Sequence, residues 1–279
     1  MIRIKNLGFV YKNGKSPALE DINIEIANGD FLGITGTSGA GKTTFTFALC
    51  GIIPQKIKGD FYGAVIVDGK DTAEYPAEEF SRKVGEVFQD IDSQMVASVV
   101  EDEILFGLEN FGLPHDLIKE RVDNVLKELG IQDLRYREIS SLSGGQKQKV
   151  AIASMLAMQP EVIVLDEPTG ELDPESSREI FKILSKLNKE KGITVIIVEQ
   201  KIMLLCEYVK HMMVLDKGHI AFYGTPRDMT TSIDKFLELG INVPRVTELS
   251  SKLIRDNIYD GEIALTVDEA ENIVRRILE

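Results

Sequence analysis

The stretch of sequence that decides the fold is Gly36-Thr37-Ser38-Gly39-Ala40-Gly41-Lys42-Thr43. It fits the pattern G-x-x-x-x-G-K-[ST] completely, follows an apolar run at 31–35 and opens an expected helix at 42–50. The glycines allow backbone N–H groups to turn towards phosphate oxygens, and the start of a helix adds a partial positive charge. Average residue usage would give such a match by chance in about one of a hundred chains of this length. A phosphate-binding loop is therefore expected rather than an accidental glycine turn.

The side chains of this loop have separate expected roles. Lys42 should reach the β- and γ-phosphates of ATP, and the hydroxyl of Thr43 should bind Mg²⁺. The predicted cofactors are therefore ATP and Mg²⁺. The residues expected to hold the nucleotide here are Gly36, Thr37, Ser38, Gly39, Ala40, Gly41, Lys42, Thr43 and Thr44.

A second apolar run, at 162–165, ends in the two acids Asp166 and Glu167. Carboxylates at the end of a buried strand are costly unless something at the carboxyl edge of the sheet uses them. Asp166 is placed to hold Mg²⁺, directly or through water, and Glu167 is placed to orient or deprotonate the attacking water. Taken alone, the two acids could equally cap a following helix. Together with the phosphate loop they indicate hydrolysis of a nucleotide.

Strands and helices alternate in the second half of the chain. Helices are expected at 144–159 and 175–190, and fully apolar strands at 162–165 and 194–198. Continuous apolar strands between helices are typical of a buried, largely parallel sheet.

Three other regions differ from this pattern. The first 35 residues contain strands separated by turn residues, and the segment at about 92–142 is expected to be a helical insertion. Within it, the apolar spacing at 116–129 predicts one face of an amphipathic helix, and Gly130 stands where its C-cap would be. The chain closes with a helix-rich tail whose last helix is expected at 266–278.

Composition excludes several classes of protein. Lys and Arg number 32 against 45 Asp and Glu, a net charge of −13, which argues against a nucleic-acid partner. The two cysteines, Cys50 and Cys206, have no neighbours at metal-ligand spacing. No apolar run approaches the ~18 residues of a membrane-spanning helix. Any membrane role is therefore expected to come through a partner.

One further motif, Leu142-Ser143-Gly144-Gly145-Gln146, stands at the start of an expected helix. Ser143 is a natural N-cap, and capping alone would explain it. The five residues resemble the signature of the ABC ATPases. This resemblance implies that the signature of one subunit, here Ser143, Gly145 and Gln146, closes on the γ-phosphate bound by the phosphate loop of another. It implies a head-to-tail pair of cassettes with ATP in the interface.

Other elements of the ABC family occur in the expected order. Tyr11 stands where the family has an aromatic residue that stacks on adenine; the less favoured alternative is an aromatic on a strand face. Gln89 matches the Q-loop, which touches the metal and relays the nucleotide state to the helical region. Asp173, in the run 171–173, matches the D-loop, which implies a position at the dimer interface.

The chain departs from the family at one position. The family usually has a histidine after the strand that corresponds to 194–198, and here Gln200 takes its place. The three histidines, His115, His211 and His219, lie elsewhere and are expected at the surface. Glutamine can donate a hydrogen bond to a γ-phosphate oxygen but cannot carry a positive charge. We therefore expect that nucleotide binding is kept and hydrolysis is slowed, with Glu167, Gln200 and Lys42 as the catalytic residues.

The resemblance narrows further to one class of transporter ATPase. The segment between Gln89 and Leu142 is too short for the long coiled coil of DNA-repair relatives. Residues 89–94 and 99–110, with the tail at 237–244 and 265–270, resemble the energy-coupling factor ATPases, which power uptake of vitamins or of cobalt and nickel. Two other readings stay open: an ATP-gated dimerising subunit with slow or no hydrolysis, and the ATPase of another class of ABC transporter.

The predicted fold is the α/β P-loop NTPase fold of an ABC cassette. The resemblance implies a RecA-like core with an antiparallel β subdomain and a helical subdomain in residues 1–225, and a small helix-rich extension at 226–279. The implied partners are a second ABC ATPase subunit, identical or a paralogue, a transmembrane coupling subunit and a substrate-binding membrane subunit. This places the chain at the cytoplasmic face of the cell membrane. The acids at 101–103 are expected either to pair with basic residues of a partner or to be solvated.

Overall fold

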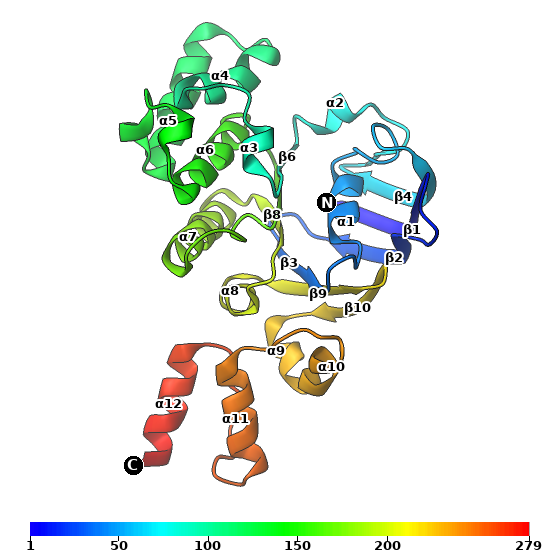
Figure 1. The fold of residues 1–279 in the computed structure, drawn as a ribbon, viewed down its shortest axis with the longest axis vertical. Coiled ribbons are helices and arrows are strands. Elements are labelled where there is room, and N and C mark those ends of the chain that lie inside the picture. The colour runs from blue at the N-terminus through cyan, green and yellow to red at the C-terminus, as the bar shows by residue number, and fades with distance from the viewer. Residues whose placement is uncertain (279) are drawn as a thin grey trace.

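The chain forms two β-sheets with the first helix between them (Figure 1). The structure, a computed structural model, describes residues 1–278. One sheet is antiparallel, in the order β2-β1-β4-β5, with strands Leu19–Ile26, Ile2–Tyr11, Gly59–Val67 and Lys70–Asp71. Helix α1 (Lys42–Leu49) packs against β4 of this sheet and against β3 and β7 of the other. One apolar core joins both sheets through this helix.

The second sheet has six strands in the order β10-β9-β3-β8-β7-β6. All pairings except β9 with β10 are parallel. Every residue of β7 and β8 is buried, which explains why both read as continuous apolar runs. The predicted parallel sheet is thus confirmed. Its strands are His219–Gly224, His211–Asp216, Phe31–Gly36, Thr194–Val198, Val162–Asp166 and Val84–Val87.

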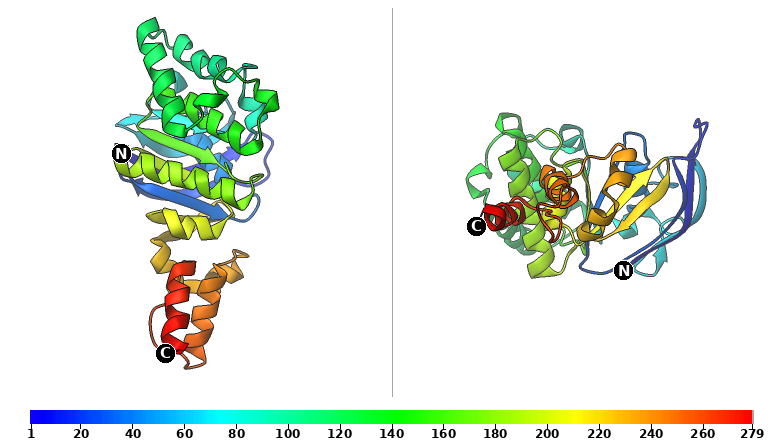
Figure 2. Two further views of the ribbon diagram at one scale, coloured as in Figure 1. Left: turned by 90° about the vertical axis from the view of Figure 1, so that its left-hand side faces the viewer. Right: turned by 90° about the horizontal axis from the view of Figure 1, so that it is seen from below.

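Helices flank the sheets at both ends of the molecule. The helical insertion contains α3, α4 and α5, which pack against α6, and α11 and α12 lie side by side at the opposite end (Figures 1 and 2). The helices after α1 are α2 (Ala77–Phe80), α3 (Ile91–Gln94), α4 (Val100–Asn110), α5 (His115–Leu129), α6 (Gly144–Ala157), α7 (Pro174–Lys191), α8 (Ile202–Tyr208), α9 (Pro226–Met229), α10 (Ile233–Glu238), α11 (Arg245–Arg255) and α12 (Val267–Leu278).

The predicted helix ends agree with the local chemistry. Helix α5 ends at Gly130, whose φ of 65° is the left-handed C-cap conformation. Helix α6 begins after Ser143, whose hydroxyl accepts the N–H of Gln146 while the Gln146 side chain accepts the N–H of Ser143. This reciprocal capping box fixes the start of the signature helix.

One expectation about charged residues is wrong. Glu103, expected to be solvated or to meet a partner, is buried and accepts the N–H groups of Val96 and Ala97 at 2.9 and 2.8 Å. Its neighbour Glu101 accepts a hydrogen bond from Arg135 at 2.9 Å. Glu103 therefore holds the loop between α3 and α4 in place, because a buried carboxylate needs such donors, and Glu101 ties α4 to Arg135.

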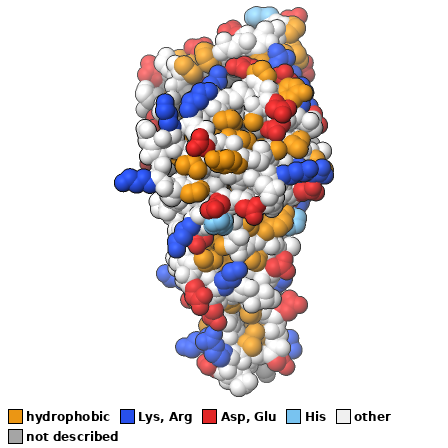
Figure 3. Space-filling model, turned by 90° about the vertical axis from the view of Figure 1, so that its right-hand side faces the viewer, with side chains coloured by type: hydrophobic (Ala, Val, Ile, Leu, Met, Phe, Trp, Pro, Cys, Tyr) orange, Lys and Arg blue, Asp and Glu red, His pale blue; other side chains and the backbone are white. Residues whose placement is uncertain are grey.

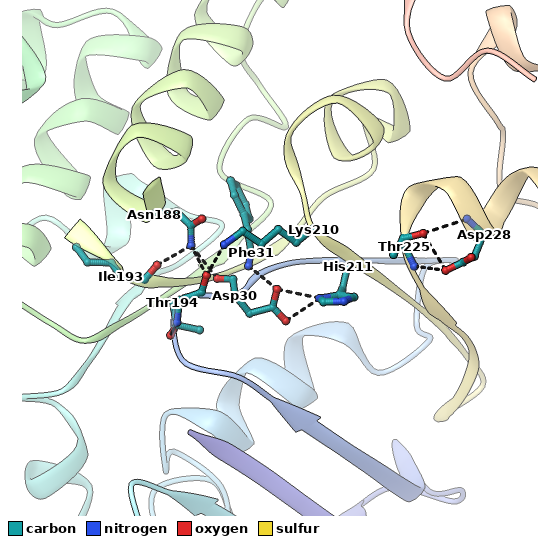
Figure 4. Close-up of polar contacts among 10 residues, drawn as sticks. Asp30, Phe31, Asn188, Ile193, Thr194, Lys210, His211, Thr225 and Asp228 are labelled. Carbon is teal, nitrogen blue, oxygen red and sulfur yellow. Dashed lines mark hydrogen bonds and ion pairs between the residues drawn. The ribbon is translucent and has the colours of Figure 1, made fainter. Parts of the chain in front are cut away.

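His211 lies at the surface, as expected, with its side chain 39% exposed, but it also has a buried partner. Its Nδ1 lies 2.9 and 3.0 Å from the two carboxylate oxygens of the buried Asp30 (Figure 4). Beside this pair, the Asn188 amide donates to three backbone carbonyls and ties α7 to the starts of β3 and β8. His115 and His219 are exposed, as expected.

On the side of the antiparallel sheet, charges of both signs lie on the surface and are not separated into patches of one sign. Acidic and basic side chains are interspersed there (Figure 3). Among residues 1–278, no helix combines the length and the apolar character needed to cross a membrane.

One acid lies in the apolar layer beneath the phosphate-loop helix. Burial, reinforced by the negative charge of Asp166, raises the pKa of Glu86 in β6 to about 8, although a hydrogen bond with the Cys50 thiol opposes the rise. Burial likewise raises the pKa of the Cys50 thiol. One carboxylate oxygen of Glu86 has no hydrogen-bond partner among the residues that the structure describes. Glu86 is therefore mostly protonated at neutral pH.

Replacing Glu86 with Gln should remove a pH-dependent cost of folding. An unperturbed glutamate has a pKa of 4.5 and the folded-state value is about 8, so the folded state binds its proton more tightly than the unfolded state. Wild-type stability is then complete below pH 4.5 and falls as the pH rises towards 8, by at most about 1.4 kcal/mol per pH unit. Thermal unfolding should show a Tm advantage of E86Q that grows over this window. The control E190Q, at an exposed acid of α7, should show no such growth; an E86Q difference that is constant with pH would contradict the assignment.

Candidate functional site

The phosphate loop lies at the carboxyl end of β3 and requires its glycines. Gly36 and Gly41 have φ values of 151° and 99°. A Cβ atom added at Gly36 would lie 2.2 Å from the carbonyl oxygen of Leu215, and one at Gly41 would lie 2.3 Å from that of Ala18. No side chain fits at either position, so the backbone can approach a ligand closely.

Lys42 lies across this loop. Its Nζ donates to the carbonyl oxygens of Gly36 and Thr37 at 2.9 and 3.0 Å, and the residue is only 8% exposed. Two residues further along α1, the Thr44 hydroxyl is 2.9 Å from the Tyr11 hydroxyl. Tyr11 also meets Phe9 edge to face. The structure therefore places the aromatic residue proposed for adenine beside the phosphate-loop helix.

Asp166 is a buried carboxyl next to this loop. Burial raises its pKa, the charge of Glu167 adds to the rise, and a hydrogen bond with the Thr43 hydroxyl and the charge of Lys42 oppose it. A bound cation would favour the ionised form. Residues 1–278 contain no group of three His, Cys, Asp or Glu able to hold a metal. The side-chain oxygens of Thr43 and Asp166 instead suit Mg²⁺, because proteins bind this ion through few side chains together with phosphates.

Glu167 is in contact with two other residues that the sequence predicts for the site, Gln89 and Gln200. Its carboxylate accepts the side-chain amide N–H groups of Gln89 at 3.2 Å and of Gln200 at 2.8 Å. These residues follow β6, β7 and β8, whose carboxyl ends lie at one edge of the sheet. Glu167 has a φ of 47°, a conformation that costs a residue with a side chain on the order of 1–3 kcal/mol. Its own N–H is bonded to the carbonyl of Val198 at 2.9 Å, which holds this conformation.

The signature residues lie apart from the phosphate loop of their own chain. In the described part of the chain, no hydrogen bond joins Ser143, Gly145 or Gln146 to that loop, and Ser143 is exposed. A cavity of about 390 Å³ separates the start of α6 from the loops that carry Gln89 and Glu167. This arrangement agrees with a signature that serves another cassette.

Sequence reasoning missed two charged residues beside Gln200. Glu199 is 1% exposed and accepts a hydrogen bond from the Thr169 hydroxyl, and Lys201 donates to the carbonyl oxygens of Thr169 and Leu172. The sequence contained a signal for these contacts: the acidic Glu199 and the basic Lys201 come shortly after the apolar run 194–198. Such charges are costly at a buried strand end unless they are paired or hydrogen-bonded.

Comparison with known proteins supports the same interpretation. The sequence pattern of the family described as ABC transporter matches residues 19–170. A putative ABC transporter ATP-binding protein of Pyrococcus horikoshii is 40% identical over 275 residues, covering 99% of this chain and 96% of that protein. An energy-coupling factor transporter ATP-binding protein of Caldanaerobacter subterraneus is 38% identical over 279 residues, covering 99% of each chain.

Solved structures share the fold. One is cbiO1 from Clostridium perfringens, described as part of the ABC transporter complex cbiONQ, which is 34% identical with a TM-score of 0.76 and covers 89% of this chain and 97% of its own. Another is an ATP-binding cassette solved as a dimer in a post-hydrolysis state bound to ADP and Pi, 29% identical with a TM-score of 0.69, covering 81% of this chain and 99% of its own. Together with the phosphate loop and the convergence on Glu167, these similarities show that the chain belongs to the ABC transporter family and is an ATP-binding cassette that hydrolyses ATP.

Proposed function

We propose that this chain is the ATPase subunit of an energy-coupling factor importer, and that it works as one of two cassettes at the cytoplasmic face of the cell membrane. The observation that carries the importer type is the similarity to an energy-coupling factor ATPase over 99% of both chains, because it includes the tail as well as the cassette. Residues 1–225 would form the nucleotide-binding domain and residues 226–279 an extension. The transported substrate would be a vitamin or a transition-metal ion that the cassette never touches.

The chemistry follows from the placement of the side chains. Lys42 and the N–H groups of the phosphate loop would bind the β- and γ-phosphates, and Thr43, Asp166 and Gln89 would hold Mg²⁺, which neutralises phosphate charge. Glu167 would orient or deprotonate the attacking water. For this, its carboxylate must give up at least one of the two amide contacts that it makes now.

The second cassette would complete the site. Its Ser143, Gly145 and Gln146 would close on the γ-phosphate, while Tyr11 of the first cassette would stack on the adenine. The exposure of Ser143 and its separation from the loop of its own chain support this proposal.

The membrane partners would bind near the Q-loop. The loop between α3 and α4, held by Glu103, borders this region and would receive a transmembrane coupling subunit that is joined to a substrate-binding membrane subunit.

A second candidate function is an ATP-gated dimerising subunit with slow or no hydrolysis. It is favoured by Gln200, because a neutral amide bonded to Glu167 can neither carry a positive charge nor shuttle a proton. The two candidates predict different ATPase rates.

Co-expression with membrane proteins tests the importer type. The chain should co-purify with a transmembrane protein that has no cassette of its own and with a small substrate-binding membrane protein, and its ATPase rate should rise in that complex. Co-purification only with a membrane protein of an exporter would contradict the proposal.

Replacing Glu167 with Gln should abolish most hydrolysis and leave ATP binding intact. The amide keeps the shape and part of the hydrogen bonding but cannot act as a base, so phosphate release should fall by about a hundredfold or more. ATP affinity is measured in parallel by fluorescence titration. E190Q, at an exposed acid in the last turn of α7, serves as the matched control and should keep the wild-type rate. Equal loss in both variants would remove Glu167 from its proposed role.

Replacing Gln200 with His should raise the turnover of Mg²⁺-dependent ATP hydrolysis by about tenfold, because an imidazole can carry charge near the γ-phosphate. A faster Q200H protein would mean that Gln200 slows this cassette. Equal rates would show that the site does not need the histidine and would count against the expected slowing.

A further inference from the structure

The segment that follows β8 faces two parts of the molecule. The side chain of Gln200 contacts Glu167 at the hydrolytic site. Its two neighbours, Glu199 and Lys201, turn instead to the segment 169–177, which contains the D-loop at 171–173.

Lys201 uses all of its donors on this segment. Its Nζ donates to the carbonyl oxygen of Thr169 at 2.6 Å, to that of Leu172 at 3.0 Å and to the hydroxyl of Ser177 at 2.7 Å. An ammonium group has three N–H donors, so none remains for another partner. The two carbonyls bracket the turn before Asp173, and this single side chain therefore fixes the path of the D-loop.

Glu199 holds the same turn from the other side. It is 1% exposed, and one oxygen accepts the N–H groups of Gln200 and Lys201 at 2.8 and 3.1 Å. The other oxygen accepts the hydroxyl of Thr169. Two opposite charges thus bind one loop, and no ion pair between them is present among the described residues. Each charge is stabilised by polar groups of the segment 169–177, so this segment and residues 199–201 move together.

The end of this connection is the start of α7. The Asp173 carboxylate accepts the N–H groups of Glu175 and Ser176 at 2.9 and 3.0 Å and so is fixed as the N-cap. In the proposed dimer Asp173 faces the second cassette. A displacement of Gln200 towards a γ-phosphate would therefore be passed through Lys201 to the dimer interface.

We propose that Lys201 is a positioning residue that couples nucleotide occupancy, read at Gln200, to the D-loop and through it to the second ATP site. The inference rests on the proposed pairing of two cassettes. It assigns no contact with substrate to Lys201, and it predicts that the two sites lose their cooperation when the three hydrogen bonds are removed.

The test replaces Lys201 with Met, which keeps the length of the side chain and removes its donors. The matched control is K210M, because Lys210 also donates to a backbone carbonyl, that of Gly29 at 2.6 Å, but at the other edge of the sheet (Figure 4). A milder variant, S177A, removes only one of the three acceptors. For each protein, ATP hydrolysis is measured against ATP concentration, and hydrogen–deuterium exchange is followed in a peptide that covers 169–173.

In K201M we expect faster exchange at 169–173 by about tenfold, a kcat lower by about tenfold, an ATP KM within about twofold of wild type, and a Hill coefficient that falls to about 1. S177A should change each quantity in the same direction and by less, and K210M should behave as wild type. A KM that is kept while the Hill coefficient falls distinguishes positioning from general destabilisation.

Two results would overturn the inference. One is a K201M protein with a lower Tm but with wild-type kcat and Hill coefficient below that temperature. This result would mean that Lys201 only stabilises the structure. The other is unchanged exchange at 169–173. A wild-type chain that does not hydrolyse ATP or does not dimerise would instead count against the proposed function, and the exchange rates would still decide whether Lys201 holds the D-loop.

Discussion

The parallel packing of β3, β8 and β7 is the constraint on which the rest of the structure depends. The three strands run side by side, with Ile34 opposite Val198 and Val198 opposite Asp166. Because parallel strands end at one edge, segments that are far apart in the sequence deliver the phosphate loop, the two acids and Gln200 to one place. Strands β7 and β8 are buried on both faces, so the register is fixed by apolar packing, and a slip of one residue would send Glu167 to the wrong side.

At this edge, neutral groups rather than cations hold the Glu167 carboxylate, which we propose acts in hydrolysis. Glu167 has a strained backbone and two amide donors, while the ammonium of Lys42 is bonded to the loop. Amide donors orient a carboxylate without pairing its charge, so it keeps the charge that a base needs. Asp166 is buried instead, which raises its pKa, and a nearby cation would favour its ionised form.

Local chemistry explains how far the sequence predicts this structure. The helix at α5 with its Gly130 cap, the capping box at Ser143 and the apolar strands all follow from residues within a few positions of one another. The contacts of Gln89 and Gln200 with Glu167 do not follow in this way, because they depend on the strand order β8-β7-β6, which only the structure shows. The roles of Glu103, His211 and Lys201 could not be predicted in this way. Each depends on a partner from another segment, and a charged residue in a sequence looks the same whether it is solvated or buried with donors.

Helix α7 is a rigid connection between the two edges of the parallel sheet, where its strands begin and where they end. It has 18 residues, which corresponds to a length of about 27 Å. Its first turn is held by Lys201, and its last turns are held by the three hydrogen bonds from Asn188 to the backbone beside Asp30. Asp30 in turn contacts His211, at the start of the hairpin that leads into the C-terminal helices. A tilt of α7 at the nucleotide edge must either break the hydrogen bonds of Asn188 at its other end or move the segments that they hold, so α7 connects the start of the C-terminal hairpin to the nucleotide edge.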